Sequence, residues 1–576
     1  MSTLKRKLEA RFYEKKVSPG RPIEQFIAEL DVVLQNLHNT SRYCKKRKTE
    51  KFNSLNQNLF NINSLNQSET IPIIMKKKRN YNRLVKRLVH KFRATNTIIR
   101  RTDKSKVFHL GKKQDYELKS KDYMNKTKAY QCLDNDDPLL NLINRTNKYL
   151  LDLRLSHWIK QKQYELLSIK PEEAELSHLY YLPKAHKMNT PLRPIVAGLK
   201  HPTVKISKFL DGLLRPCFNK MARETTVTSG FELIKQLHEW SRLYMKKETL
   251  FCTMDVSDLY TMIPQVEGVL SLRRMMVNLN LKNISGVKAE AIIRLSRWVI
   301  QNNYFSYNDK FYHQIRGGAM GSPLTLTMAN CYMFFFERKI VKQVQNSGGL
   351  YLRFIDDILI AINWPYRHLS KQIDNWNELD LNIKLNPQIG PAVNFLDLYI
   401  ENLDGQLFTK VYHKPSYEPY YLPFYSVHPL HMKMNIPYEM LLRAIRYSST
   451  FQAYLNERES LRMAFLLNQY PGRFIDVQFN RVWKKFNINQ VINAYNYNDL
   501  RQQIINYPEK EKTPTDYDKH LFIHFTYCSS MKRFPSRFHA LWNKYFGESP
   551  IADIIPILGT RNVKNLQQRL VSTRKS

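Results

Sequence analysis

The sequence has few cysteines, and their spacing forms no metal-binding or cross-linking pattern. The six cysteines among 576 residues stand at positions 44, 132, 217, 252, 331 and 528, with no C-x-x-C pair. This scatter argues against a zinc knuckle and a disulfide framework, and it fits a reducing compartment. Long apolar runs are also lacking: no stretch approaches the ~18 apolar residues of a membrane span, and the basic start is followed by no apolar secretion segment. We therefore expect an intracellular protein that is neither secreted nor inserted in a membrane.

Acidic residues are scarce relative to basic ones. The chain carries 90 Lys and Arg against 50 Asp and Glu, a net charge of +40, and residues 1–130 carry 32 against 11, an excess of 21. Such a field attracts a phosphate backbone, so the composition points to nucleic acid as the partner. Two basic clusters, 45–48 and 76–79, suit nuclear import or RNA binding, and the sequence does not separate these uses. We expect a nuclear protein.

The first hundred residues predict one helix and one linker. Apolar residues at helical spacing between Phe26 and Leu37 indicate an amphipathic helix that packs on other parts of the protein. Between Phe52 and Glu69 the chain is rich in Asn, Ser and Gln, and the pentapeptide Asn-Ser-Leu-Asn-Gln occurs at 53 and again at 63. We expect a polar linker there, with a domain boundary between about 50 and 95.

Two adjacent acids interrupt an apolar, strand-forming stretch, Arg353-Phe354-Ile355-Asp356-Asp357-Ile358-Leu359-Ile360. Unpaired charges in such a stretch are costly unless a cation lies on them. A β-hairpin with these acids at its tip would help to hold two divalent ions roughly 4 Å apart, as phosphoryl transfer requires. A solvated turn is the alternative for this segment alone.

A third acid ends another apolar run. Asp255 follows Phe251-Cys252-Thr253-Met254, and its place at the end of a predicted strand lets it face the hairpin. The Val256 carbonyl would add an oxygen ligand of the kind that Mg²⁺ prefers. A strand that ends in a helix-capping Asp is the alternative.

A glycine-rich turn lies between these two segments, at Gln314-Ile315-Arg316-Gly317-Gly318-Ala319-Met320-Gly321-Ser322-Pro323-Leu324. Ser322 as the cap and Pro323 at the first helical position predict a helix start, followed by a buried helix. The glycines allow a backbone to approach a flat ligand such as a base pair closely.

In this order, the three segments resemble the motifs of reverse transcriptases. Asp255 with Tyr260 is similar to motif A, Gly321-Ser322-Pro323 to motif B, and Phe354-Ile355-Asp356-Asp357 to motif C. The commoner motif C begins with Tyr, so Phe354 is a departure that removes a hydroxyl near the primer end. Upstream, Tyr181-Leu182-Pro183-Lys184-Ala185-His186-Lys187 and Pro191-Leu192-Arg193-Pro194-Ile195-Val196 resemble the fingers motifs that grip the incoming triphosphate.

Further segments are similar to Penelope-like retroelement reverse transcriptases, which are related to telomerase. These are Asn394-Phe395-Leu396-Asp397, Tyr412-His413-Lys414-Pro415, Tyr420-Tyr421-Leu422 and Ser426-Val427-His428-Pro429 with Lys433 and Pro437. Family members often carry a C-terminal GIY-YIG endonuclease, but neither a GIY nor a YIG tripeptide occurs here. We expect the chain to lack this nuclease and to depend on a 3′-hydroxyl from a chromosome end or from another enzyme.

The resemblance, which runs from about residue 100 to 570, implies an α+β fold of the right-hand polymerase type. The expected parts are a basic N-terminal extension with a polar linker (1–95), fingers with an extension (96–240), a palm with motifs A to E (241–400), a mostly helical thumb (401–500), and a basic, aromatic, helical C-terminal extension (501–576). In the palm we expect a sheet with helices on one face.

The same resemblance implies an RNA-directed DNA polymerase that uses dNTPs, an RNA template, a DNA primer and two Mg²⁺ ions, with Mn²⁺ as an alternative. Asp255, Asp356 and Asp357 would be catalytic, and Asp255, Val256 and Asp356 would bind metal. The residues expected to contact the nucleotide are Lys184, Lys187, Arg193, Tyr260, Gln314, Gly321, Ser322, Phe354 and Lys384, the last of which is as readily a surface lysine. The residues expected to contact primer or template are Lys410, Tyr412, Lys414, His428 and Lys433.

Other functions stay open. An RNA-dependent RNA polymerase would use the same palm, but it needs room for a ribose 2′-hydroxyl where bulky Tyr260 stands. A telomerase-like enzyme is a further relative, and a domesticated nucleic-acid-binding protein would have lost an acid, whereas all three are present. In the tail, His520 and His524 would share a face if that stretch is helical, although packing or surface roles suit them better than a second nuclease site. The template and the oligomeric state are left open.

Overall fold

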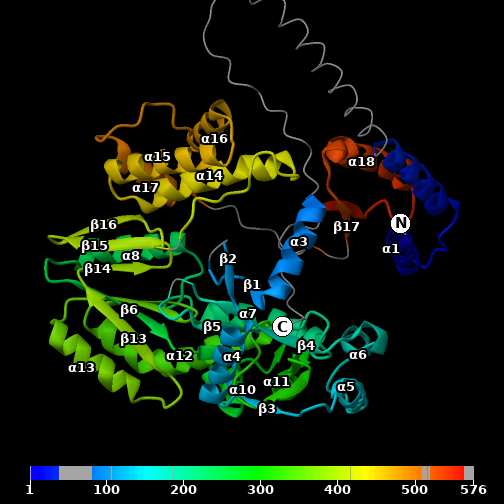
Figure 1. The fold of residues 1–576 in the computed structure, drawn as a ribbon, viewed down its shortest axis with the longest axis horizontal. Helices are drawn as coiled ribbons and strands as arrows, with labels where there is room; N and C mark the ends of the chain where they lie inside the picture. Colours follow the sequence, from blue (N-terminus) through cyan, green and yellow to red (C-terminus); the bar gives the residue numbers. More distant parts are fainter. Residues whose placement is uncertain are drawn as a thin grey trace, which may run out of the picture.

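The structure is a computed structural model that describes residues 2–37, 81–104, 107–185, 187–415, 417–508, 516 and 519–563. Helices are mixed with several separate, mainly antiparallel sheets, which confirms the expected α+β class. We keep the expected names fingers, palm and thumb for residues 96–240, 241–400 and 401–500. In Figure 1 the palm and fingers lie below, and the thumb and a module built from both ends of the chain lie above them. Among these residues, no helix is long and apolar enough to cross a lipid bilayer. The predicted linker and both basic clusters lie outside the described residues.

The palm contains a four-stranded antiparallel sheet in the order β11-β12-β6-β13. Its strands are β11 (Leu350–Phe354), β12 (Asp357–Ile362), β6 (Leu250–Val256) and β13 (Leu385–Gly390). All five residues that follow Asp357 in β12 are buried, as in a strand covered on both faces. Ile358 and Ile360 belong to one hydrophobic core, and Leu359 and Ala361 belong to another on the opposite face.

Different layers cover the two faces of the palm sheet. One face packs on the helices α7 (Val204–Met221), α10 (Gln265–Asn278), α11 (Ala289–Gln301), α12 (Pro323–Asn346) and α13 (Tyr366–Asn377). The other packs on α8 (Gly230–Tyr244) and on a sheet of β14 (Ala392–Phe395), β15 (Leu398–Leu403) and β16 (Gln406–Val411). Helices were expected on one face, and the covering of the second face agrees with the continuous apolar run of β12.

The fingers contain a five-stranded sheet in the order β3-β10-β9-β4-β5. Its strands are β3 (Tyr130–Cys132), β10 (Lys310–Gln314), β9 (Tyr304–Tyr307), β4 (Ser177–Pro183) and β5 (Leu192–Ala197). The β4–β5 hairpin packs on α4 (Lys113–Thr127), where Tyr181 is fully buried and its backbone N–H donates to the Tyr116 hydroxyl. Strands β9 and β10 come from the segment assigned to the palm, so the two domains interleave along the chain.

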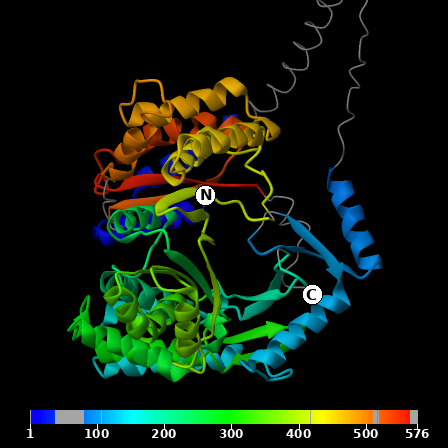
Figure 2. The ribbon, with the colours of Figure 1, turned by 90° about the vertical axis from the view of Figure 1, so that its left-hand side faces the viewer.

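Shorter elements surround these sheets. Before the fingers sheet, α3 (Tyr81–Ala94) leads into a hairpin of β1 (Thr97–Arg101) and β2 (Phe108–Lys112), and Figure 2 shows α3 at the edge of the molecule. In the turn of this hairpin, the Asp103 N–H donates to the Pro183 carbonyl at the end of β4 (2.9 Å). The other elements beside the palm and fingers are α5 (Leu139–Leu155), α6 (Gln161–Leu167), β7 (Asn283–Ile284) and β8 (Val287–Lys288).

The thumb is helical and has its own hydrophobic core. Its helices are α14 (Leu430–Tyr447), α15 (Phe451–Leu467), α16 (Gly472–Lys485) and α17 (Tyr497–Asn506). Tyr454 and Tyr497 stack within this core, and the Tyr497 hydroxyl donates to the Ser448 carbonyl after α14.

Residues 2–37 and 519–563 fold together, and we call them the terminal module. Its elements are α1 (Ser2–Glu14), a helix over residues 21–37, β17 (His520–Thr526), α18 (Phe534–Phe546) and β18 (Ile555–Arg561). The fully buried Phe26 ring contacts Phe538, Trp542 and Phe546 of α18, with ring centroids 5.6, 6.1 and 4.9 Å away. The predicted amphipathic helix is therefore confirmed, but the two expected extensions share one core.

Candidate active site

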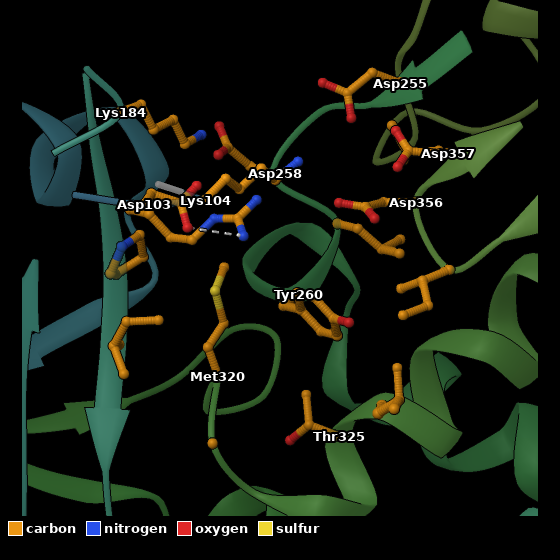
Figure 3. A pocket seen from close by; sticks show the side chains of 18 of the residues that line it. Asp103, Lys104, Lys184, Asp255, Asp258, Tyr260, Met320, Thr325, Asp356 and Asp357 are labelled. Carbon is orange, nitrogen blue, oxygen red and sulfur yellow. Dashed lines mark hydrogen bonds and ion pairs between the residues drawn. The ribbon is translucent and has the colours of Figure 1, made fainter. Parts of the chain in front are cut away.

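A cleft of about 530 Å³ lies between the fingers and the palm. Figure 3 shows Asp255, Asp356 and Asp357 at one side of this cleft, Lys104 and Lys184 at the other, and Tyr260 between them. Eleven of the predicted site residues line it, namely Lys184, Lys187, Arg193, Asp255, Val256, Tyr260, Gly321, Ser322, Phe354, Asp356 and Asp357. Segments that are far apart in sequence thus meet in one place.

Strand pairing brings the three aspartates to the same end of the palm sheet. Strands β6 and β12 are antiparallel with Asp255 directly opposite Asp357, and the Val256 N–H donates to the Asp356 carbonyl at 2.9 Å. Residues that face each other in such a pair have Cβ atoms about 4.5–5.5 Å apart. Backbone register alone therefore places the carboxylates side by side.

A buried arginine holds the turn between β11 and β12. Ile355 in this turn has a φ of +59°, a backbone conformation that a β-branched residue rarely adopts. The Arg353 guanidinium is fully buried, and it donates to the Ile355 carbonyl (3.0 Å), to Asn330 Oδ1 (2.7 Å) and to Glu337 Oε2 (2.6 Å). Burial raises the pKa of Glu337, and the charge of Arg353 opposes this rise. The position of Asp356 thus depends on an ion pair inside the palm.

The aspartates repel one another. The pKa of Asp357 is raised to about 6, first by burial and then by the charge of Asp356, whereas the charge of Lys104 lowers it. Asp255 adds to the rise, and the Lys414 ammonium of the thumb opposes it. This end of the sheet therefore holds negative charge that the protein only partly neutralises, and a divalent cation would neutralise it.

The opposite wall of the cleft is cationic. Lys187 lies 3.9 Å from Asp255 Oδ2, and Arg193 Nη1 lies 3.5 Å from Asp103 Oδ1. Burial lowers the pKa of Lys184, and the charges of Arg193 and Lys187 lower it further. The cations are close enough to repel one another, so a polyanion that entered the cleft would relieve this repulsion.

Asp103 and Lys104 also line the cleft, although they belong to none of the sequence motifs. They occupy the turn between β1 and β2, and the Asp103 side chain is only 8% exposed. Its Oδ2 atom is buried with no hydrogen-bond partner among the described residues. The available sequence signal was a single acid within the basic run Arg100-Arg101-Thr102-Asp103-Lys104.

Tyr260 lies in the short helix α9 (Leu259–Met262) after Asp258. Burial raises the pKa of Tyr260 to about 12, with a contribution from the charge of Asp356. Gly317 has a φ of +67°, and a Cβ there would lie 2.1 Å from the Tyr260 carbonyl oxygen. A Cβ on Gly321, at φ +137°, would lie 2.4 Å from the Val196 carbonyl oxygen. The glycines thus allow the protein's own backbone segments to meet, rather than only a ligand.

The helix start predicted at Ser322 and Pro323 is confirmed, but its capping differs from the expectation. The Ser322 side chain makes no capping hydrogen bond and pairs instead with the Ser207 hydroxyl of α7 (2.7 Å). Ser207 Oγ in turn accepts from the Leu324 N–H at 3.0 Å. A hydroxyl from another helix therefore caps α12 and joins it to α7 beside the cleft.

Two predicted nucleotide contacts lie elsewhere. Gln314 is fully buried in β10, and its amide donates to the Arg316 carbonyl (2.9 Å), so no contact with a nucleotide follows from its position. Lys384 is exposed and donates to the carbonyl of Asn377, the last residue of α13 (2.9 Å), outside the residues that line the cleft. This position favours the alternative expectation for Lys384, a surface lysine.

The predicted primer and template residues divide into three groups. Lys414 is near enough to the cleft for the charges of Lys104 and Asp357 to act on its pKa, which burial lowers. Lys410 lies over the Tyr399 ring, 4.7 Å from its centroid, and the Tyr412 N–H donates to the Asp397 carbonyl. His428 and Lys433 line a different cavity, next to the terminal module.

The tail histidines do not lie on a helix. His520 and His524 belong to strand β17, so the condition under which they would share a helical face is not met. Four residues along a strand span about 13 Å, too far for both rings to bind one metal ion. The His520 ring also pairs with the Asp516 carbonyl (2.5 Å).

The donors at the end of the palm sheet fit a hard cation. Across the described ranges, no three His, Cys, Asp or Glu side chains already form a group that could hold a metal ion. Mg²⁺, however, commonly takes one or two carboxylates and completes its shell with substrate phosphates and water. Asp255, Asp356 and the Val256 carbonyl offer such oxygens, and the raised pKa of Asp357 marks the uncompensated negative charge beside them.

Comparisons with known proteins give weak similarities of fold. Telomerase from Candida albicans in complex with the TWJ fragment of telomeric RNA has a TM-score of 0.49 at 12% identity, covering 81% of this chain and 73% of that one. Apo telomerase from Candida tropicalis has a TM-score of 0.42 at 12% identity (76% and 75% covered), and the Sicinivirus 3Dpol RNA-dependent RNA polymerase has 0.35 at 14% (54% and 68%). A family profile, the animal helix-turn-helix domain, matches residues 420–480, which include α14 and α15. No match to a curated protein sequence was found.

Proposed function

We propose that the protein is an RNA-directed DNA polymerase of the Penelope-like type, which extends a DNA primer on an RNA template with dNTPs. The observation that carries this proposal is the pairing of Asp255 with Asp357 beside Asp356, opposite Lys184, Lys187 and Arg193 in one cleft. Carboxylates on one wall suit divalent cations, and cations on the other suit a triphosphate. The motif run from Tyr412 to Pro437 supports the Penelope-like assignment.

The residues divide the chemistry between them. Two Mg²⁺ ions, when bound, would activate the primer 3′-hydroxyl and neutralise the departing pyrophosphate. Asp255, Asp356 and the Val256 carbonyl would hold these ions, and Asp357 would keep the site negative. Arg193 presents a forked guanidinium to the phosphates, and Lys184 and Lys187 add point charges. In the free protein, two of these cations pair with acids: Lys187 with Asp255, and Arg193 with Asp103. The bound triphosphate would replace the acids as the partner of both cations.

A primer-extension assay tests the proposal. With a labelled DNA primer on an RNA template, the purified protein should incorporate dNTPs in the presence of Mg²⁺, and a DNA template and Mn²⁺ serve as comparison arms. Asp356→Asn should reduce synthesis by at least about 10³-fold, because it removes a charge that the metal site needs. Asp374→Asn, on the exposed surface of α13, is the matched control and should retain full activity. Robust extension by Asp356→Asn would refute the assignment.

The sugar preference separates this proposal from an RNA-dependent RNA polymerase. Tyr260 lines the cleft five residues after Asp255, where its ring would lie under the sugar of the incoming nucleotide. Tyr260→Ala should therefore admit ribonucleotides that the parent rejects. A folded variant with unchanged selectivity between rNTPs and dNTPs would mean that Tyr260 only packs. A parent protein that prefers rNTPs would favour the RNA polymerase.

A further inference from the structure

A second cavity, of about 680 Å³, lies between the thumb and the terminal module. The thumb contributes Tyr425, His428, His431 and Lys433, and the terminal module contributes Tyr527 and Lys532. None of the residues that line it also lines the active-site cleft. We propose that this cavity, the junction groove, binds single-stranded nucleic acid. The proposal does not depend on polymerase activity.

The charge of the junction groove has one sign. Lys433 and Lys532 are cationic, His428 and His431 add polar rings, and no Asp or Glu of the described chain lines it. Burial and the charge of Lys433 lower the pKa of His428, so this ring is neutral at pH 7 and offers a hydrogen-bonding nitrogen. A groove with cations and neutral donors but no acid suits a phosphodiester backbone, which carries one negative charge per nucleotide.

Aromatic rings are interleaved with these cations. The Tyr425 side chain is 77% exposed, and its ring meets Phe424 edge-on, with centroids 5.7 Å apart. Phe424 is itself held by Tyr470 and Phe474 of the thumb core (5.3 and 5.2 Å). On the facing wall, Tyr527 extends the strand β17. An exposed ring on a rigid support is a platform for base stacking, which every base allows whatever its sequence.

The two walls of the groove come from segments about a hundred residues apart, and Figure 1 shows the thumb and the terminal module next to each other above the palm. Apolar side chains such as Val427, Leu430 and Met531 also line the groove, but none of the described acids does. A protein ligand would more often meet charges of both signs, whereas stacking rings beside charge of one sign favour a single strand. The shared chemistry of RNA and DNA single strands fits it, and a ribose 2′-hydroxyl would distinguish between them.

Photo-crosslinking locates the bound strand directly. The full chain is irradiated without dNTPs in the presence of 12-nucleotide single strands that contain 5-iodouracil, in one arm as RNA and in the other as DNA. We expect crosslinks at Tyr425 or Tyr527, and the arm with the higher yield identifies the preferred strand. Crosslinks confined to Tyr260 and Phe354 in the active-site cleft would overturn the proposal.

Binding measurements with matched variants provide the second readout. By fluorescence anisotropy, Tyr425→Ala and Tyr527→Ala should each weaken single-strand binding by about 5-fold to 150-fold, which corresponds to ~1–3 kcal/mol per stacked base. Lys433→Ala with Lys532→Ala should make the slope of log K against log salt shallower by about 0.7 per lost phosphate contact. The controls Tyr366→Ala and Lys371→Ala, exposed on α13, should change neither quantity. Equal effects from the groove and control variants would overturn the proposal.

Discussion

At the scale of single residues, Asp357 lies where burial and two other carboxylates oppose its negative charge. Its pKa in the folded protein is about 6, against 3.8 as an ordinary value, so the folded state binds more protons than the unfolded state between these pH values. The free energy of unfolding of the metal-free protein should therefore fall as pH rises from about 4 through about 6. Above pH 6, Asp357→Asn should be more stable than the parent by up to about 2 kcal/mol, allowing for partial solvent screening.

Thermal unfolding with EDTA at several pH values measures this effect. Added Mg²⁺ should raise the midpoint of the parent more than that of Asp357→Asn, because bound cations offset the repulsion among carboxylates. A parent whose midpoint does not change between pH 4.5 and 7 relative to the variant would contradict the shifted pKa.

A second prediction at this scale concerns Asp103, whose carboxylate pairs with Arg193 and has one buried oxygen without a partner in the described structure. It places a negative charge where the triphosphate would bind. Asp103→Asn should lower the KM for dNTPs by about 3-fold to 10-fold with little change in kcat, since a like charge near a polyanion disfavours binding. Steady-state kinetics measures both constants. A higher KM would show instead that Asp103 holds Arg193 in its productive orientation.

At the scale of elements, the turn between β11 and β12 depends on the Arg353–Glu337 pair. Arg353→Met should destabilise the palm by about 3–5 kcal/mol, because Glu337 would keep a buried, unpaired charge. Arg353→Met with Glu337→Leu should recover most of that stability. Primer extension by the double variant should stay low, because the hydrogen bond to the Ile355 carbonyl is still missing. Full activity of the double variant would mean that the turn keeps its shape without Arg353.

The elements also show how far the sequence could predict the structure. The palm strands β6 and β12 and the start of α12 were predictable, because strands buried on both faces form continuous apolar runs and because Ser-Pro marks a helix start. The position of the β1–β2 turn was not predictable, since Asp103 matches no motif and is held at the cleft by long-range contacts with Pro183 and Arg193. Gln314 lies buried outside the cleft lining, because proximity to a motif in sequence does not place a side chain in the cleft. The capping of α12 by Ser207 could not be predicted either, because Ser207 belongs to a different helix, α7.

At the scale of the whole molecule, the shared core of the terminal module means that deleting the basic N-terminus would have two separate effects. Deleting residues 1–95 would remove positive charge and would also uncover α18. A single substitution separates the two effects: Phe26→Ala should weaken the terminal module by about 3–5 kcal/mol and leave every lysine in place. Hydrogen exchange should show faster exchange in α18 and unchanged exchange in β6 and β12. Val32→Ala, at an exposed position of the same helix, is the control. Equal protection of α18 in both variants would contradict the shared core.

The packing of Phe26 on α18 also determines when the N-terminal helix can fold against its partner during biosynthesis. The helix over residues 21–37 leaves the ribosome more than five hundred residues before Trp542, its partner. At a translation rate of about 5–20 residues per second, its apolar face lacks α18 as a packing partner for roughly 25–100 s. During that interval the nascent chain presents a hydrophobic helix beside a strongly basic segment. A chaperone that shields this helix would therefore be needed most during translation of the palm and thumb, and least once the last strand has emerged.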